Sequence, residues 1–265
     1  MSVRRGDNQG QGGAPSDGDD DGRPDAGDID PEAIPVAKAL TPMRRERLLL
    51  AESGVISDRL PVGMATEEQF DAFRQLRTTL LSMAAAVGRT HFTTLVVPVT
   101  SGSGASFVAR NLAAVFTLQD KRVAILVDCN LRHPTQHLAL GVPAEERGLF
   151  DYLEKPRAGL DRLLRPTDIA GLHLIPAGVR SSIPREYFSS QPMRVVMAAL
   201  QQAPCYVFLD GPPTQGSPDA RILSDLVDFV ILVAGYGLAT TEEIAAAAAL
   251  FEPTKFAGVV FNERS

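Results

Sequence analysis

Residues 96–113 read VVPVTSGSGASFVARNLA and place an apolar run, a glycine-rich turn and a helix-forming segment in succession. This order is typical of loops that hold phosphate groups on backbone N–H donors at the start of a helix. The phosphate-loop pattern GxxxxGK[ST] also requires a lysine that reaches the outer phosphates. Here Ala105 stands before Ser106. The stretch therefore predicts a phosphate-type loop that lacks its lysine.

Apolar runs alternate with helix-like segments around this stretch. Several runs are continuously apolar over five or more residues, which is typical of strands that are buried on both faces of a parallel sheet. We therefore expect a doubly wound α/β fold, with a mainly parallel sheet covered by helices. The expected strands lie in HFTTLVVPV, KRVAILVDC, LHLIPA, CYVFLDG, DFVILVAG and KFAGVVFN.

Two acidic residues, Asp128 and Asp210, each end one of these apolar runs. In an open parallel sheet the ligand site lies beyond the carboxyl ends of the strands, so both carboxylates are expected beside the glycine-rich loop. With Ser106 they form a candidate Mg²⁺ site and candidate catalytic pair, one carboxylate orienting the metal and the other acting as a base or positioning water. Aspartate and glycine also end strands for purely structural reasons, so only the ordered combination supports this interpretation. The candidate nucleotide-binding residues are Gly102, Ser103, Gly104, Ala105, Ser106, Phe107 and Asn262.

The chain divides into three parts by composition. Residues 1–32 are rich in Gly, Asp and Pro, with too few apolar residues to offset the entropy of ordering, so we expect an acidic disordered tail. Residues 33–65 are expected to form a linker with a short helix, and residues 66–265 a single domain. At the start of that domain, TEEQFDAFRQLRTTLLSMAAAV (66–87) predicts an amphipathic helix, because apolar residues recur every three or four positions.

Charge and cysteine usage exclude several classes of function. The formal net charge is −6, and residues 1–30 carry eight Asp against three Arg, so the remainder is nearly neutral. Nucleic-acid binding needs a basic surface, and none is indicated. Cys129 and Cys205 lack the spacing of a disulfide framework or a zinc site. Because no secretory core or bilayer-spanning run is present, we expect a cytoplasmic protein.

Seven segments together resemble one protein family. FDAFRQLRTTL (70–80) fits an acidic-x-x-Arg-x-x-Arg helix, GASFVARNLA (104–113) is similar to GKTFxAxNLA, and LVDCNLRHPTQH (126–137) is similar to hIDaDLRxPxxH. GLFDYL (148–153), IPAGVRSSIPREYFSS (175–190), YVFLDGPP (206–213) and SPDARILSDLVDFVILV (217–233) continue the likeness. They resemble the bacterial tyrosine kinases (BY-kinases) of capsule and exopolysaccharide biosynthesis, of the CpsD/CapB type. That family consists of P-loop NTPases related to the MinD and ParA ATPases.

The resemblance carries expectations about assembly and partners. It implies a P-loop NTPase-like domain and an oligomerisation helix with Asp71, Arg74 and Arg77 on the motif, so we expect a homo-oligomer. It further implies docking on a membrane-bound polysaccharide co-polymerase, which controls chain length, at the inner face of the cytoplasmic membrane. Further positions that match the family pattern are Gly178, Pro184, Glu186 and Ser190.

The departures from the family pattern all concern phosphate transfer. Ala105 stands where the family has its lysine, the loop is shorter than the family's TSxxPGEGK, and Asn130 replaces the second aspartate of the second acidic motif. Losing one charge-assisted phosphate contact of about 2 kcal/mol would weaken nucleotide binding about thirtyfold. No tyrosine follows Tyr236, so we expect the family's phosphate-accepting tyrosine cluster to be missing.

Three cations of the chain are candidate replacements for the lysine. Arg132 belongs to the retained LRHP segment, Lys121 to a turn between helix and strand, and Arg110 is expected to point off the helix a turn too late. None is an evident substitute. The sequence therefore favours a pseudokinase-type regulator or adaptor, with Mg-ATP binding weak or absent. The alternatives are an active tyrosine autokinase or ATPase with an unusual loop, and a MinD- or ParA-like positioning ATPase.

Overall fold

The computed structural model describes most of the chain beyond the predicted linker. The predicted tail (1–32) and linker (33–65) lie outside the described residues, as do Lys121 and Pro184. The described residues are 67–118, 122–143, 147–156, 159–178, 186–216 and 218–263.

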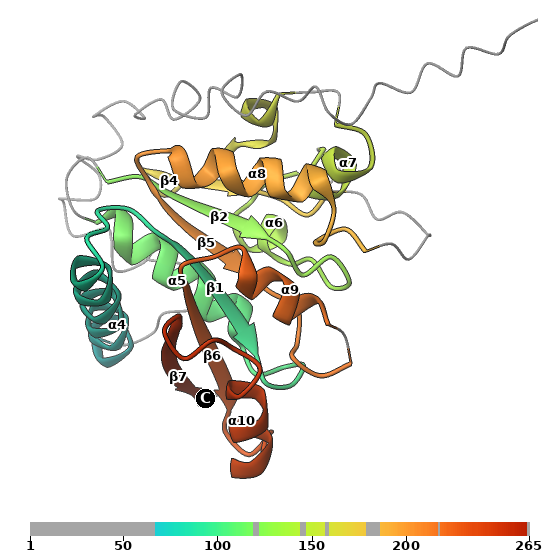
Figure 1. Cartoon of the computed structure of the whole chain (residues 1–265). Helices are drawn as coiled ribbons and strands as arrows, with labels where there is room; N and C mark the ends of the chain where they lie inside the picture. The colour runs from blue at the N-terminus through green and yellow to red at the C-terminus, as the bar shows by residue number, and fades with distance from the viewer. Residues whose placement is uncertain are drawn as a thin grey trace, which may run out of the picture.

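A seven-stranded sheet forms the centre of the fold, with the order β3-β4-β2-β5-β1-β6-β7 (Figure 1). All neighbouring strands pair in parallel except β3 and β4, so the predicted mainly parallel α/β sheet is confirmed. The two-residue strand β3 is too short for a periodicity signal. The strands are β1 Thr93–Pro98, β2 Ala124–Asp128, β3 Arg165–Pro166, β4 Leu172–Ile175, β5 Tyr206–Asp210, β6 Phe229–Gly235 and β7 Phe256–Asn262.

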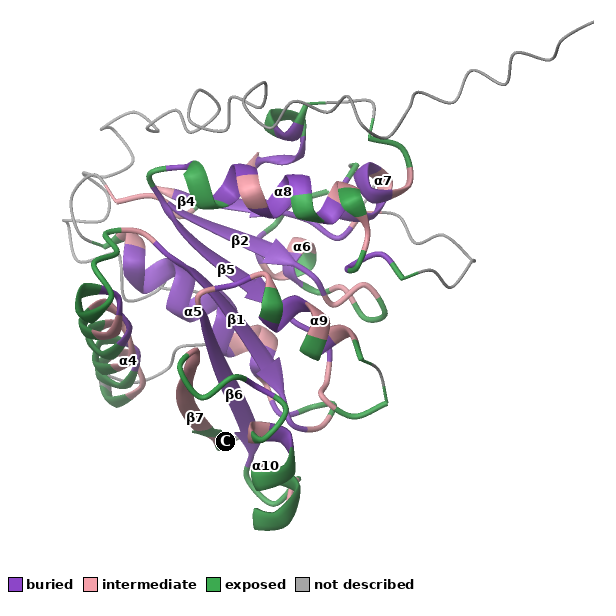
Figure 2. Ribbon diagram, in the orientation of Figure 1, coloured by how far each residue is buried: buried purple, intermediate pink, exposed green. Residues whose placement is uncertain are grey.

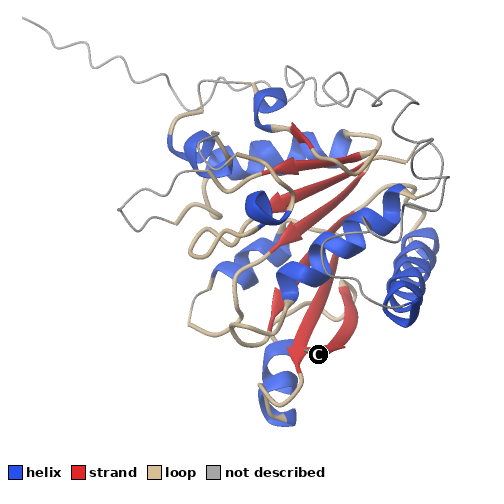
Figure 3. Ribbon diagram, turned by 180° about the vertical axis from the view of Figure 1, so that it is seen from behind, coloured by secondary structure: helices blue, strands red, loops and turns tan. Residues whose placement is uncertain are grey.

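Helices cover both faces of the sheet. Residues of α4 and α5 share one buried cluster with one face of the strands. Figure 3 shows α5 in front of the strands when the sheet is seen from behind, with α4 to its side. Residues of α7, α8, α9 and α10 share a second cluster with the opposite face. The helices are α4 Glu67–Ala86, α5 Ala105–Thr117, α6 Gln136–Ala139, α7 Leu149–Glu154, α8 Gln191–Gln202, α9 Asp219–Asp225 and α10 Thr241–Ala248, with a 3₁₀ turn η2 at Leu160–Leu163.

The continuous apolar runs form the strands that are buried on both faces. Every residue of β1, β2, β5 and β6 is buried (Figure 2), as expected for central strands between two helical layers. The edge strand β7 is only half-buried, and the Phe261 side chain is 73% exposed. The amphipathic helix predicted over 66–87 is confirmed as α4, which buries Phe73 and Leu80.

Candidate functional site

The glycine-rich loop after β1 folds back on itself. The Ser103 hydroxyl donates to the Thr100 carbonyl oxygen at 2.7 Å, and the Ser103 side chain is buried. Gly102 and Gly104 have φ angles of 84° and 83°, in the left-handed region that glycine adopts without the penalty other residues meet. This loop therefore makes a tight turn between β1 and α5, as the stretch 96–113 predicts.

Helix α5 begins directly after the loop. Val108 N–H donates to the carbonyl of Gly104 at 3.0 Å, which closes the first helical turn. The N–H groups that precede Val108 on a helix start have no partner within the helix, and together they favour an anion. The Ala105 side chain, however, is only 4% exposed and packs into the cluster beneath α5. The methyl group at the position expected for the lysine therefore faces the core.

Asn262 at the end of β7 reaches this loop. Its side-chain nitrogen, Nδ2, donates to the carbonyl oxygen of Ser103 at 3.1 Å. The same nitrogen lies 2.1 Å from the place where a Cβ at Gly104 would stand, so no side chain larger than glycine fits there unless Asn262 moves. The predicted nucleotide contact Asn262 therefore lies against the predicted phosphate loop, and its amide bonds the loop backbone.

Asp128 and Asp210 lie at the ends of the adjacent strands β2 and β5. They are direct partners in the parallel register, and neither side chain is exposed. Asp128 accepts three backbone N–H bonds, from Asn130 at 3.2 Å, Thr135 at 3.1 Å and Gln136 at 3.1 Å. The structure thus brings together the two strand-end carboxylates that the sequence predicts, because parallel strands end at one edge of the sheet.

The fully buried side chain of Gln136 joins this pair to helix α5. Its nitrogen Nε2 donates to Asp210 Oδ2 at 2.7 Å and to the Ser106 carbonyl at 2.9 Å. Its oxygen Oε1 accepts from Arg110 Nη1 at 3.1 Å. Sequence reasoning missed this residue, although it stands in the LRHPTQH segment, because a glutamine at the start of the four-residue helix α6 carries no periodic signal.

Arg110 lies inside the site and corrects a sequence-based expectation. The sequence predicts that it points off the helix, yet it is only 8% exposed and donates to Gln136. Helix α5 is buried around most of its circumference between Val108 and Phe116, so a single apolar face could not be identified from spacing. The pKa of Arg110 is lowered by burial and raised by attraction to Asp210.

Burial governs the charge state of the two carboxyl groups. Desolvation and then repulsion from Asp210 raise the pKa of Asp128 to about 8, against its backbone hydrogen bonds. Desolvation raises the pKa of Asp210 to about 6, opposed by hydrogen bonds from Gln136 and Ser106 and by the charge of Arg110. At neutral pH the pair of carboxyl groups therefore retains one proton, and the charge of Arg110 offsets the negative charge that remains.

The hydrogen bonds of the two carboxyl groups oppose the binding of a magnesium ion in this arrangement. Mg²⁺ demands near-octahedral oxygen ligands and keeps several waters. Both oxygens of Asp128 and one oxygen of Asp210 already accept protein N–H groups, and a guanidinium lies in the same buried cluster. Within the part of the chain that the structure describes, no group of three or more His, Cys, Asp or Glu could hold a metal ion. Asp210 Oδ1 is buried without a hydrogen-bond partner, and Mg²⁺ is usually held by one or two carboxylates together with substrate phosphates and waters. The assignment of Ser106, Asp128 and Asp210 as metal ligands therefore stays a prediction.

The predicted oligomerisation residues have different environments on α4. Arg77 Nη1 donates to the carbonyl of Val115 in the last turn of α5 at 2.9 Å. Arg74 and Asp71 are exposed and form an ion pair at 3.2 Å on the surface of α4. Arg77 thus joins two helices of one chain, while Arg74 and Asp71 remain accessible. Their role in oligomerisation stays a prediction.

The remaining motif residues have structural contacts. Gly148 packs so closely on Gly178 that a Cβ at Gly148 would lie 2.2 Å from the Gly178 nitrogen, which explains glycine at both positions. Ser190 caps α8 by accepting the Met193 N–H at 3.3 Å. Glu186 is exposed. These residues shape the segments around α7 and α8 and do not reach Asp128 or Asp210 through any hydrogen bond between described residues.

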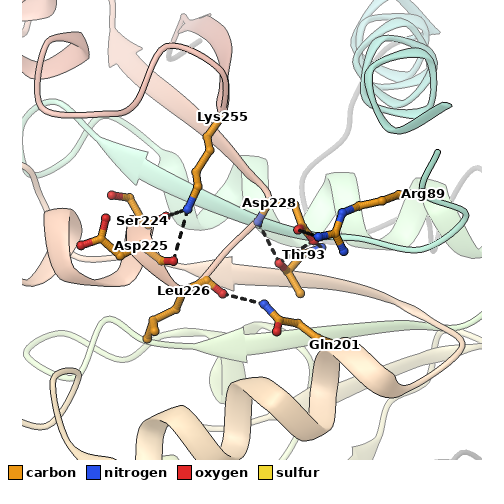
Figure 4. Close-up of polar contacts among 8 residues, drawn as sticks. All are labelled: Arg89, Thr93, Gln201, Ser224, Asp225, Leu226, Asp228 and Lys255. Carbon is orange, nitrogen blue, oxygen red and sulfur yellow. Dashed lines mark hydrogen bonds and ion pairs between the residues drawn. The ribbon is translucent and has the colours of Figure 1, made fainter. Parts of the chain in front are cut away.

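A cavity of about 530 Å³ lies at the amino ends of the central strands, near the starts of β1 and β6 and away from Asp128 and Asp210. Its polar groups bond one another (Figure 4): Asp228 accepts from Thr93 Oγ1 at 3.0 Å and pairs with Arg89 at 3.1 Å. Lys255 donates to the carbonyl oxygens of Ser224 and Asp225, near the end of α9. These bonds hold the strand starts and the end of α9 together. The cavity contains none of the sequence-predicted site residues.

Among the described residues, no helix is both long enough and apolar enough to cross a membrane.

Comparison with known proteins identifies homologues. No family model matches the chain. The chain is 32% identical over 209 residues to the tyrosine-protein kinase wzc of Salmonella typhi, a match that spans 78% of this chain and 28% of wzc. It is 29% identical over 205 residues to the tyrosine-protein kinase YwqD of Bacillus subtilis strain 168, spanning 77% of this chain and 83% of YwqD. The chain therefore corresponds to less than a third of the wzc protein and to most of YwqD.

Solved structures share the fold. The kinase domain of the Escherichia coli tyrosine kinase ETK superposes with a TM-score of 0.64 at 23% identity, over 79% of each chain. The cell division ATPase MinD of Pyrococcus furiosus superposes with a TM-score of 0.53 at 19% identity, over 64% of this chain and 70% of MinD. The chain is thus a homologue of the bacterial tyrosine-protein kinases and has the fold of their kinase domains, which is shared with the MinD-type P-loop ATPases.

Proposed function

We propose that the chain is a pseudokinase-type adaptor of exopolysaccharide synthesis and export, which keeps the kinase fold and has lost efficient phosphate transfer. It acts at the cytoplasmic face of the membrane, as a homo-oligomer docked on a polysaccharide co-polymerase. The homology to tyrosine kinases such as wzc and YwqD supports the pathway. The partner and the assembly rest on the resemblance of the sequence motifs.

The single observation that carries the proposal is the environment of Ala105. Its methyl group is buried against the core beneath α5, where the phosphate-loop pattern requires an extended cation. That lysine both binds the outer phosphates and stabilises the charge of the transition state. A buried methyl group does neither, so binding and transfer are both reduced.

The arrangement around the loop supports the same conclusion. The Ser103 carbonyl is bonded by Asn262, and the Ser103 hydroxyl is bonded to Thr100. The Ser106 carbonyl is bonded by Gln136, and the Ser106 side chain interacts with Asp210. The Ser106 side chain, the candidate Mg²⁺ ligand of the loop, is therefore already engaged within the protein.

Calorimetric titration of the full chain with Mg-ATP tests the proposal. We expect no binding in the low micromolar range. Ala105→Lys should strengthen binding by about thirtyfold if the missing charge is the main deficit, since a charge-assisted contact is worth about 2 kcal/mol. Ala105→Met adds similar bulk without charge and is the matched control. Low micromolar affinity of the wild-type chain, with transfer of radiolabelled phosphate to tyrosine, would overturn the proposal.

One observation favours an active kinase or ATPase as the second candidate. Asp128, Asp210 and Ser106 remain together at the carboxyl end of the sheet. If the chain turns over ATP, Asp210→Asn should abolish turnover. The exposed substitution Asp225→Asn should leave it unchanged, because Asp225 lies at the opposite edge of the sheet.

A further inference from the structure

The buried acidic pair has a cation of its own within the chain. Arg110 lies one helical turn after Ser106 on α5, and residues four apart share one face of a helix. Only 8% of the Arg110 surface is exposed, and its positive charge is attracted to Asp210. A buried carboxylate without a compensating charge is costly, and the usual solutions are an ion partner or a metal.

Gln136 connects this cation to both carboxyl groups. The amide oxygen accepts from Arg110 Nη1 at 3.1 Å, and the amide nitrogen donates to Asp210 Oδ2 at 2.7 Å and to the Ser106 carbonyl at 2.9 Å. The backbone N–H of Gln136 donates to Asp128 Oδ2 at 3.1 Å.

The amide of Gln136 has only one orientation that satisfies these neighbours. Its two N–H donors meet two acceptor oxygens, and its oxygen meets a guanidinium donor. The flipped amide would place its oxygen against the oxygens of Asp210 and Ser106, and its donors against Arg110. The cation therefore fixes the amide, and the amide fixes the segment 130–136 against α5.

We propose that Arg110, acting through Gln136, is a built-in counter-cation that takes the place of a divalent metal at Asp128 and Asp210. The site then keeps α5, the strand ends and the segment 130–136 joined without a bound ion. This inference rests on the proposed adaptor function. A chain that binds a partner without phosphate transfer would keep one shape whether or not a metal ion is bound.

Metal titration of the full chain without nucleotide tests the proposal, with melting midpoints recorded in EDTA, MgCl₂ and MnCl₂. The wild-type midpoint should be the same in all three. Arg110→Met should lower the midpoint in EDTA and allow Mg²⁺ or Mn²⁺ to raise it again by about 3 °C or more, as expected when a ligand binds the folded state alone. Arg221→Met removes a half-exposed arginine paired with Asp225 and should show no metal response.

Two results would overturn the counter-cation: a wild-type midpoint that rises with Mg²⁺ as much as that of Arg110→Met, or an Arg110→Met chain that gains nothing from either metal. If Arg110→Met does not fold, the double variant Arg110→Met/Asp210→Asn decides. Removing the cation and one carboxylate together should restore folding. A double variant no better than the single one would show that Arg110 acts by packing alone.

These outcomes are separable from those that test the proposed function. Phosphate transfer by the wild-type chain would overturn the proposed adaptor function. The proposal for Arg110 would still stand if Mg²⁺ did not raise the melting midpoint of the nucleotide-free wild-type chain. If Mg²⁺ stabilised the wild-type chain and no phosphate were transferred, the proposal for Arg110 would be overturned and the proposed adaptor function would still stand.

Discussion

Asp128 and Asp210 are direct register partners on the parallel strands β2 and β5, and neither carboxyl group reaches solvent. Two buried carboxyl groups this close cannot both ionise at low cost. Burial and repulsion from Asp210 raise the pKa of Asp128 to about 8. The pair therefore links the stability of the fold to pH.

Stability should fall as the pH rises from mildly acidic to alkaline values. The folded chain keeps a proton on Asp128 up to a pKa of about 8, whereas an unfolded chain releases it near the ordinary aspartate value of about 4. The folded state thus binds more protons across this window, and each pH unit costs up to about 1.4 kcal/mol. The stabilising contribution is complete below the unfolded pKa and is lost as the pH rises through the folded one. Urea unfolding across the window measures it.

Asp128→Asn should flatten this profile, because asparagine carries no titrating proton. Asp161→Asn, at an exposed position, is the matched control and should keep the wild-type slope. A wild-type profile that is already flat, or an unchanged slope in Asp128→Asn, would contradict the buried protonated pair.

The carboxylates could be predicted from sequence, whereas their partners could not. Asp128 and Asp210 end apolar runs, and the geometry of parallel sheets brings strand ends to one edge. The sequence predicts that Arg110 points outward, and this prediction is wrong. Because α5 is buried on nearly all sides, helical spacing does not distinguish a cation that faces the interior from one that faces solvent. Gln136 begins the short helix α6, eight residues after Asp128, and only tertiary folding brings it onto Asp210.

The same distinction holds for the fold. The central strands and α4 follow from continuous apolar runs and a three-to-four spacing, which are local signals. The close approach of Gly148 to Gly178 depends on two segments thirty residues apart. Sequence reasoning found both glycines through motif resemblance, and the structure supplies the reason: the backbones touch.

Asp228→Asn should destabilise the fold through the strand starts shown in Figure 4. Asp228 Oδ2 accepts the Thr93 N–H at 2.8 Å, and its side chain, 11% exposed, pairs with Arg89. Loss of the charge weakens both contacts in a largely buried setting, so we expect a cost of about 1–3 kcal/mol in chemical denaturation. Asp225→Asn removes an exposed ion pair with Arg221 and should cost less than about 0.5 kcal/mol. Equal effects of the two substitutions would contradict this role of Asp228.

Arg77→Met should destabilise the chain by about 1–2 kcal/mol. The guanidinium donates to the Val115 carbonyl in the last turn of α5, where helix carbonyls lack partners and favour a cation. Arg74→Met, at an exposed position on the same helix, should change stability by less than about 0.5 kcal/mol. Thermal melts of both variants measure the difference, and equal midpoints would show that the contact of Arg77 contributes nothing.

Arg74 is consequently the residue that tests oligomerisation without disturbing the fold. It is exposed and forms an ion pair with Asp71, which is also exposed, so a neighbouring chain can reach it. If α4 associates through this arginine, Arg74→Glu should shift the sedimentation coefficient toward that of a monomer, with far-ultraviolet circular dichroism unchanged. Arg194→Glu, on the exposed face of α8, controls for charge reversal in general. A coefficient that stays at the wild-type value would identify Arg74 as a solvated helix arginine, and the association surface would then have to be sought elsewhere on the chain.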